Sequence, residues 1–267
     1  NRVRRQRQMC IRDSLYSAFT YYCGFKVNSG EYKLMGLAPY GKPKYIKKIK
    51  DNLIDIKEDG TFRLDMSFFK FHRGFRMTSK KFHKFFGAPP RAKESELTQF
   101  HMDLAASIQK VTEEIVLKIA KNLREETGIR NLCLAGGVAL NCVANGKLLK
   151  EKIFDEIWIQ PASGDAGSAL GAALVSWYQF YKNPRTINPN DSMKGSYLGC
   201  NFSNNEIINY LTSINAPYIT LDDKELFKKI SEKLDEGMVI GWFNGPMEYG
   251  PRALGAVSYT HLTLPTN

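Results

Sequence analysis

Apolar residues recur every three or four positions between residues 97 and 119, which is the spacing of one face of an α-helix. The stripe consists of Leu97, Phe100, Leu104, Ile108, Val111, Ile115 and Ile119. A glycine at position 128 follows, and glycine commonly ends a helix because it adopts the left-handed backbone without strain. The pattern therefore predicts a long amphipathic helix that buries this stripe and ends near Gly128.

Short apolar runs alternate with helical patterns in the rest of the chain. Strands are expected at 132–134 and 157–159, with helices at 141–150 and 165–181. Beyond them we expect further strands at 196–198, 218–220 and 239–242, and helices at 204–214 and 224–235. Strands that alternate with helices are typical of an α/β fold with a parallel sheet.

The first ninety residues have a less regular pattern. It predicts an aromatic amphipathic helix over 14–25, a loop over 28–41, a basic helix over 43–52 and a hairpin over 53–64 that turns at Asp-Gly. In residues 67–91, seven phenylalanines interleave with lysine and arginine. Such interleaving can stack bases and hold phosphates, but a packed insertion with a basic outer face is the favoured interpretation.

Two adjacent glycines, Gly136 and Gly137, separate a predicted strand from the helix that follows it. Without side chains there, an anionic ligand can lie against backbone N–H groups at a helix N-terminus. Asn141 and Asn145, one helical turn apart, add amide donors and acceptors. The loop is a candidate phosphate site, with a simple tight turn as the alternative.

A second strand–loop–helix unit follows and carries Asp165 in its loop. Because ligands bind at the carboxyl ends of strands in open α/β sheets, Gly137 and Asp165 are expected at one sheet edge. A carboxylate there could hold a hard or borderline metal ion. The alternative is that Asp165 is the N-cap of its helix.

Two glycine-framed loops carry further charged candidates. Lys33, in Glu-Tyr-Lys-Leu-Met-Gly, would neutralise a phosphate or a developing oxyanion, and is otherwise a surface lysine. Arg252 follows Glu248 by four residues, and a fixed guanidinium suits bidentate phosphate recognition. The alternative for this second loop is a Glu–Arg pair that stabilises it.

Composition narrows the class of protein. The formal charge is +11, of which the first 13 residues supply +4 and the remainder +7; this balance favours anionic ligands without identifying a fold. No apolar run approaches the roughly 20 residues of a membrane span. Cys23, Cys133, Cys142 and Cys200 show no Cys-x-x-Cys spacing, so we expect reduced, mostly buried thiols in a cytoplasmic protein.

Three long segments resemble the nodulation- and antibiotic-type O-carbamoyltransferases. They are residues 17–45, which include EYKLMGLAPYGKPKY, residues 134–174, which include LAGGVALNCVANGKL and PASGDAGSALGAAL, and residues 241–255, GWFNGPMEYGPRALG. Pro246 stands where relatives often carry arginine, so an arginine pair is not expected in the third segment.

The resemblance implies a fold and a reaction. Residues 14–182 would be the C-terminal part of an actin-like ATPase/sugar-kinase (ASKHA) type domain, and 183–195 a linker. Residues 196–256 would begin an α/β domain similar to threonylcarbamoyl-adenylate synthases. Family chemistry converts ATP and carbamoyl phosphate to carbamoyl-adenylate, and then transfers the carbamoyl group to a hydroxyl of a sugar or natural product.

The same resemblance assigns roles to the candidates. Lys33 and Asp165 would be catalytic, and the cofactor-binding residues would be Gly136, Gly137, Asn141, Asn145, Glu248 and Arg252. In the family the equivalent of Asp165 shares a divalent metal, iron or magnesium, with two histidines that would lie upstream of Ser14. The expected partner is a small-molecule acceptor, with no nucleic acid and no membrane, and this chain alone is expected to be inactive.

The two ends of the chain have a different character. Residues 4–13 and 257–267 resemble translated sequencing-adapter DNA, so we expect residues 1–13 and 257–267 to make few core contacts. Two other functions stay open on sequence alone: another actin-like nucleotide-binding protein, such as a sugar kinase or a nucleotide-sensing regulator, and a nucleic-acid-binding module built on residues 67–91.

Overall fold

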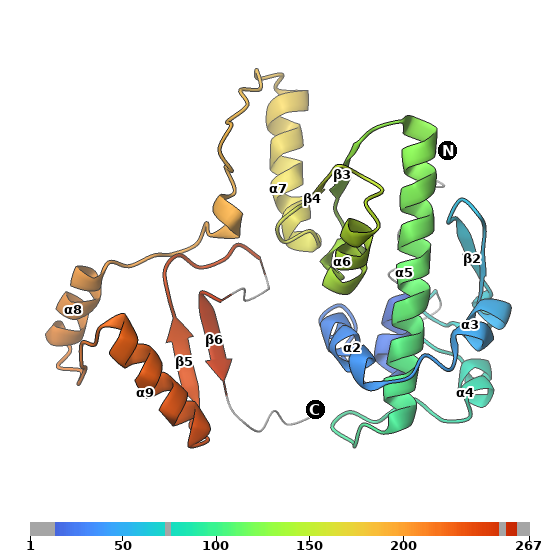
Figure 1. Cartoon of the computed structure of the whole chain (residues 1–267), viewed down its shortest axis with the longest axis horizontal. Helices are drawn as coiled ribbons and strands as arrows, with labels where there is room; N and C mark the ends of the chain where they lie inside the picture. The colour runs from blue at the N-terminus through green and yellow to red at the C-terminus, as the bar shows by residue number, and fades with distance from the viewer. Residues whose placement is uncertain (1–13, 73–75, 251–254, 261–267) are drawn as a thin grey trace. The chain divides into compact units, whose positions relative to one another are not determined.

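The computed structural model describes residues 14–72, 76–250 and 255–260 (Figure 1). The chain divides into two compact units, with the boundary between Ile159 and Gln160. This boundary precedes the linker expected at 183–195. None of the helices in the described ranges is both long enough and apolar enough to cross a bilayer.

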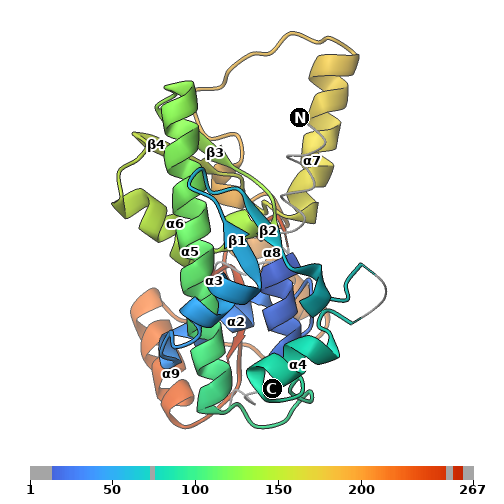
Figure 2. The same ribbon diagram turned by 90° about the vertical axis from the view of Figure 1, so that its right-hand side faces the viewer.

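Helix α5 (Gln99–Thr127) is the longest element of the first unit (Figures 1 and 2). Leu104, Ile108, Val111 and Ile115 of the predicted stripe are buried, and the other three members pack at the edge of the same core. Gly128 ends the helix with a left-handed backbone at φ +66°. The predicted helix, its buried face and its end are all confirmed.

The loop expected over residues 28–41 is wrong, because most of this segment is helical. Helix α2 (Glu31–Leu37) leads directly into the 3₁₀ turn η1 (Ala38–Tyr40). Leu34 and Leu37 lie three positions apart and are both buried. Burial of two leucines contributes about 3–6 kcal/mol, which outweighs the roughly 1 kcal/mol that a helical glycine costs.

Residues 41–45 dock on α5 through buried polar contacts. The Asp103 carboxylate accepts hydrogen bonds from the backbone N–H of Lys42 at 2.7 Å and from Lys44 Nζ at 2.6 Å. Burial alone would raise the pKa of this carboxyl, but the hydrogen bonds that it accepts outweigh burial and lower its pKa to about 2. Four residues later along α5, Ser107 Oγ accepts from the backbone N–H of Tyr45 at 3.0 Å.

The other predicted elements of this region are confirmed. Residues 14–22 are helical, and α3 (Ile46–Asn52) is the short basic helix. Strands β1 (Ile54–Ile56) and β2 (Phe62–Leu64) form an antiparallel hairpin with Ile54 opposite Leu64. Gly60 turns the chain between them with φ +78°.

The phenylalanine-rich segment is a packed part of the core, as the favoured interpretation predicts. It contains η2 (Met66–Phe68) and α4 (Lys80–Phe86), and the rings of Phe68, Phe69, Phe82 and Phe86 are buried. Lysine ammonium groups lie outside the aromatic layer, with Lys81 Nζ 3.9 Å from the centre of the Phe68 ring. Buried rings cannot stack on bases, so this segment does not support the nucleic-acid hypothesis.

A parallel pair of strands completes the first unit. In β3 (Asn131–Leu134) and β4 (Glu156–Ile159), Asn131 pairs with Glu156 and Leu134 with Ile159. Helix α6 (Cys142–Lys150) connects them and packs on α5. Leu132, Leu148 and Phe154 form a second small core with α5 residues. The α/β class and both predicted strands are confirmed.

In the second unit the predicted helices and the strand at 239–242 are confirmed, but two of the predicted strands are not formed. Its elements are α7 (Asp165–Val175), a π-helical turn (Ser176–Phe180), η5 (Lys194–Ser196), α8 (Asn204–Ser213), α9 (Asp223–Asp235), β5 (Ile240–Phe243) and β6 (Val257–Thr260). The strands expected at 196–198 and 218–220 are wrong, because neither segment pairs with another described strand. Each is three residues long, and so short an apolar run does not define a strand without a partner.

Strand β6 pairs antiparallel with β5, with Val257 opposite Phe243. Four residues of the C-terminal segment 257–267 are therefore in regular structure, while their core contacts remain a prediction. The N-terminal segment 1–13 and residues 261–267 lie outside the described residues.

The cysteines depart from expectation in one respect. Cys23, Cys133, Cys142 and Cys200 are free thiols, but only Cys23 is buried. Cys133 alternates with buried Leu132 along β3 and so projects from the other face of the strand.

Gly41 provides a direct test of the docking of residues 41–45 on α5. A Cβ atom at this position would overlap the backbone carbonyl of Met102, so Gly41→Ala is expected to lower the free energy of unfolding by about 1–3 kcal/mol. Urea denaturation followed by circular dichroism measures the change.

Gly36→Ala is the matched control, because Gly36 is an exposed residue of α2 with open space around it. It is expected to stabilise the protein by about 0.5–1 kcal/mol through its better helix propensity. Equal effects of the two substitutions would show that the backbone of Gly41 does not approach α5 closely.

Candidate functional site

The candidate site of the first unit is the turn between β3 and α6. Gly136 has φ +97° and ψ 169°, a conformation that is essentially restricted to glycine. The 3₁₀ turn η3 (Gly137–Leu140) follows at once. The first N–H groups of such a turn have no acceptor within it, so this backbone can donate to an anion. Because of its backbone conformation, position 136 of this turn requires glycine.

The two predicted asparagines hold this turn in place. Asn141 Oδ1 accepts from the backbone N–H of Ala144 at 3.0 Å and so caps α6. Asn145 Nδ2 donates to the carbonyl of Ala139 at 2.7 Å. The structure thus brings both asparagines to the glycine loop, but their amides bond to the protein itself.

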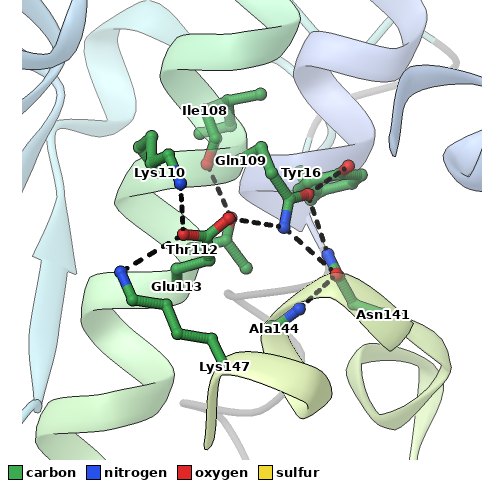
Figure 3. A network of polar contacts seen from close by, with 9 residues as sticks. All are labelled: Tyr16, Ile108, Gln109, Lys110, Thr112, Glu113, Asn141, Ala144 and Lys147. Atoms are coloured by element: carbon green, nitrogen blue, oxygen red, sulfur yellow. Dashed lines mark hydrogen bonds and ion pairs between the residues drawn. The ribbon is translucent and has the colours of Figure 1, made fainter. Parts of the chain in front are cut away.

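Asn141 also joins the loop to α5 through a pair of side-chain amides (Figure 3). Its Nδ2 donates to Gln109 Oε1 at 3.0 Å, and its Oδ1 accepts from Gln109 Nε2 at 3.1 Å. Tyr16 Oη donates to the same Gln109 oxygen at 3.0 Å. All three side chains are buried, where complete hydrogen bonding makes such a network rigid.

A buried carboxylate continues the network. Gln109 Nε2 lies 3.3 Å from Glu113 Oε1, and Glu113 Oε2 accepts from Lys110 Nζ at 2.9 Å and from Lys147 Nζ at 3.4 Å (Figure 3). The Glu113 side chain is 1% exposed. Lys147 belongs to α6, so this ion pair fastens α6 to α5 a second time.

Sequence reasoning missed Gln109 and Glu113. The one signal in the sequence is their spacing of four residues, which places both polar side chains on the same face of the helix. The apolar stripe of this helix already explains its contact with the main core. The sequence pattern does not indicate that the glycine loop and α6 pack on this second face.

Lys33 lies on α2. Helix α2 reaches the start of α6, where Cys142 Sγ lies 3.9 Å from Met35 Sδ. Lys33 is exposed and stands two positions from Met35, so it lies on another face of α2. Glu31 anchors the start of this helix by accepting from Ser17 Oγ at 2.7 Å.

Asp165 is the first residue of α7, in the second unit. The N-cap of α7 is Gly164, so the alternative that Asp165 is the N-cap is wrong. Its carboxylate is exposed and lies at the positive end of the helix dipole, where negative charge is favourable. The shared sheet edge of Gly137 and Asp165 stays a prediction, because the two residues belong to different units.

The loop that carries Glu248 lies beside Asp165 in the second unit. Tyr249 Oη donates to the carbonyl of Ala166 at 2.5 Å, and its backbone N–H donates to Ser196 at 2.6 Å. Glu248 Oε1 accepts from the backbone N–H of Ala256 at 2.8 Å, which closes the loop. Arg252 lies outside the described residues.

Asp165 alone does not make a metal site. Among the residues that the structure describes, no group of three or more histidine, cysteine, aspartate or glutamate side chains could hold a metal ion. A divalent metal normally takes several such ligands, so the metal site that Asp165 is expected to share with two histidines stays a prediction.

Comparison with known proteins identifies one family and several longer relatives. The family described as Carbamoyltransferase N-terminus matches residues 10–174. The uncharacterized protein sll1178 of Synechocystis is 60% identical over 91% of the chain, which covers 40% of that protein. Nodulation protein NolNO of Sinorhizobium fredii is 34% identical over 90% of the chain, covering 33% of that protein. Nodulation protein NolO of Bradyrhizobium diazoefficiens is 34% identical over 84% of the chain, covering 38% of that protein. The chain thus spans 33–40% of the length of these relatives.

The amide pair yields a stability prediction. Asn141→Ala removes a helix cap and leaves the buried amide of Gln109 without its partner, and is expected to lower the free energy of unfolding by about 2–3 kcal/mol. Asn145→Ala, the control, removes one hydrogen bond and is expected to cost about 1 kcal/mol. Urea denaturation measures both, and equal losses would show that the amide pair contributes nothing beyond an ordinary bond.

Proposed function

Because this chain belongs to the carbamoyltransferase family, we propose that it forms part of an enzyme that transfers a carbamoyl group to a hydroxyl. The observation that carries the proposal is the family match over residues 10–174, which includes Lys33, the glycine loop and Asp165. Family membership supports carbamoyl transfer over the alternatives of a sugar kinase or a nucleotide-sensing regulator.

The proposed reaction has two steps. In the first, water cleaves carbamoyl phosphate to inorganic phosphate and carbamate, and a carbamate oxygen attacks the α-phosphorus of ATP, which releases pyrophosphate and forms the mixed anhydride carbamoyl-adenylate. The oxygen of an acceptor hydroxyl then attacks the carbamoyl carbon, and AMP leaves. We propose a sugar or a natural product as the acceptor. Neither step needs a protein nucleophile, so catalysis would consist of positioning and charge stabilisation.

In this proposal the glycine loop binds a phosphate group of the nucleotide. Backbone N–H groups at the start of η3 would donate to it, while Asn141 and Asn145 hold the turn in shape through Ala144 and Ala139. The support is the fixed φ of Gly136 and the buried network beneath it. Catalytic groups act best when neighbouring contacts fix their positions in this way.

Charged residues would act on the phosphates and on the attacked carbonyl. We propose that Lys33 neutralises developing negative charge and that Arg252 binds phosphate, with Glu248 closing the loop on which Arg252 lies. Tyr249 ties this loop to the first turn of α7, so we place Asp165 and Glu248 in one site.

Nucleotide binding can be tested on the chain itself. Gly136→Val forces a branched residue into a backbone conformation that it cannot adopt without strain, and Gly137→Val places bulk where backbone must approach the ligand. Both are expected to weaken ATP binding by about tenfold or more in isothermal titration calorimetry.

Gly146→Ala is the control for this experiment, because Gly146 lies on α6 with open space around it. Its affinity for ATP should equal that of the unaltered chain. If both valine variants also bind ATP with unchanged affinity, the glycine loop is not part of the nucleotide site.

The reaction can be tested in a chimera, since relatives are longer than this chain. Residues of this chain would replace the matching 246 residues of the Synechocystis relative. The chimera is expected to catalyse carbamoyl-phosphate-dependent ATP–pyrophosphate exchange and acceptor carbamoylation. Arg252→Ala should reduce exchange, and Asp165→Asn should reduce carbamoylation of the acceptor.

The unaltered relative and the chimera with Gly146→Ala are the controls of this assay, and both are expected to be active. Activity of the relative together with an inactive chimera, although the chimera folds, would contradict the proposal that this chain carries carbamoyltransferase residues. Loss of both activities in Asp165→Asn, with both retained in Arg252→Ala, would contradict both assigned roles.

A further inference from the structure

A basic cavity of about 420 Å³ lies in the first unit, and none of its lining residues, among those that the structure describes, belongs to the glycine loop. Three segments line it: residues 21–25 at the end of the first helix, residues 76 and 83 on and just before α4, and residues 90–93. The lining residues that matter here are Tyr21, Phe25, Arg76, His83, Arg91 and Lys93. Four of these six are basic, and none of the described lining residues is acidic.

Arg91 is the most informative residue of this cavity. It is 8% exposed, and its Nε donates to the carbonyl of Cys23 at 2.6 Å, while Nη1 donates to the carbonyl of Ser95. Its Nη2 is buried and has no hydrogen-bond partner among the described residues. An unpaired buried donor on a charged group costs more than the 1–3 kcal/mol typical of neutral groups, and buried polar atoms normally have partners.

The surroundings of Arg91 hold its guanidinium in place. A Cβ atom on Gly24 would lie 2.8 Å from Arg91 Nε, so glycine leaves the room that the side chain occupies. The Phe25 ring centre lies 5.3 Å from Arg91 Cζ, within the range of a cation–π contact. The backbone N–H of Arg91 also donates to Tyr22 at 2.9 Å. The protein therefore fixes this cation and yet leaves one of its donors unused.

The other basic groups add to the positive potential of the cavity. Burial, together with the nearby charges of Arg76 and Lys70, lowers the pKa of His83, and His83 Nε2 lies 2.9 Å from Thr78 Oγ1. Arg76 and Lys93 are exposed at the cavity. An oxyanion in the cavity would lower the repulsion among these groups.

We propose that this cavity binds the phosphate group of a small organic phosphate. The guanidinium of Arg91, with Arg76 and Lys93 at the cavity surface, would bind the phosphate oxygens. Tyr21 and Phe25 give the cavity an aromatic wall for the organic part of the ligand, and the volume is within the usual range for small-molecule sites. Residues of this cavity and residues 136–145 do not overlap, so it is a second anion site, independent of the proposed nucleotide loop.

The test uses the full chain and three probes: inorganic phosphate, adenosine 5′-monophosphate and glucose 6-phosphate. Binding is measured by ³¹P line broadening and by the shift of the Arg91 Nε–Hε signal in ¹H–¹⁵N spectra. The double variant Arg76→Gln with Lys93→Gln is expected to weaken binding by about tenfold. The matched control, Lys150→Gln with Lys152→Gln, removes two exposed charges elsewhere and should bind like the unaltered chain.

The three probes and a further variant separate the outcomes. Tighter binding of either organic phosphate than of inorganic phosphate supports the aromatic wall and identifies a nucleoside or a sugar as the organic part. Retention of phosphate binding in Gly136→Val supports a site separate from the glycine loop. The proposal is overturned if inorganic phosphate does not shift the Arg91 signal, if both double variants lose affinity equally, or if Gly136→Val abolishes phosphate binding.

Discussion

A short row of buried polar residues on α5 determines how the first unit is assembled. Asp103 and Ser107 accept hydrogen bonds from the backbone of residues 42–45. Gln109 bonds to Asn141 beside the glycine loop, and Glu113 forms an ion pair with Lys147 of α6. Two segments that are far apart in the chain are thus fastened to three turns of one helix. Buried polar groups tolerate few alternative partners, so this row sets the registration of both segments on α5, whereas the apolar stripe supplies most of the burial.

The parts of the fold that could be predicted from sequence are those with a repeated local signal. Within α5 the stripe from Phe100 to Ile119 spans more than five helical turns, and an Asp-Gly turn separates β1 from β2. Both elements therefore have a signal that needs no tertiary information. The parallel pair β3–β4 follows from two strand–loop–helix units in succession. Local pattern is insufficient where a strand forms only if a distant segment pairs with it, as at residues 196–198 and 218–220.

The candidate site illustrates the same limit. Sequence identifies Asn141 and Asn145 as neighbours of the glycine loop, but cannot reveal that their amides are bound by Gln109, Ala144 and Ala139. The sequence of residues 28–41 predicts a loop, although burial of Leu34 and Leu37 favours a helix. The contact between Tyr249 and Ala166 joins residues 83 positions apart, for which a single sequence has no signal.

The glycine loop has one further property that concerns ligand affinity. Gly136 sets its direction, and Asn141 and Asn145 hold it in place through hydrogen bonds to Gln109 and Ala139 within the protein. Flexible loops lose conformational freedom when they close on a ligand, and this loss subtracts from affinity. A turn that is already ordered loses almost none, so its donors can hold even a small anion, whose few contacts could not compensate for ordering a mobile loop.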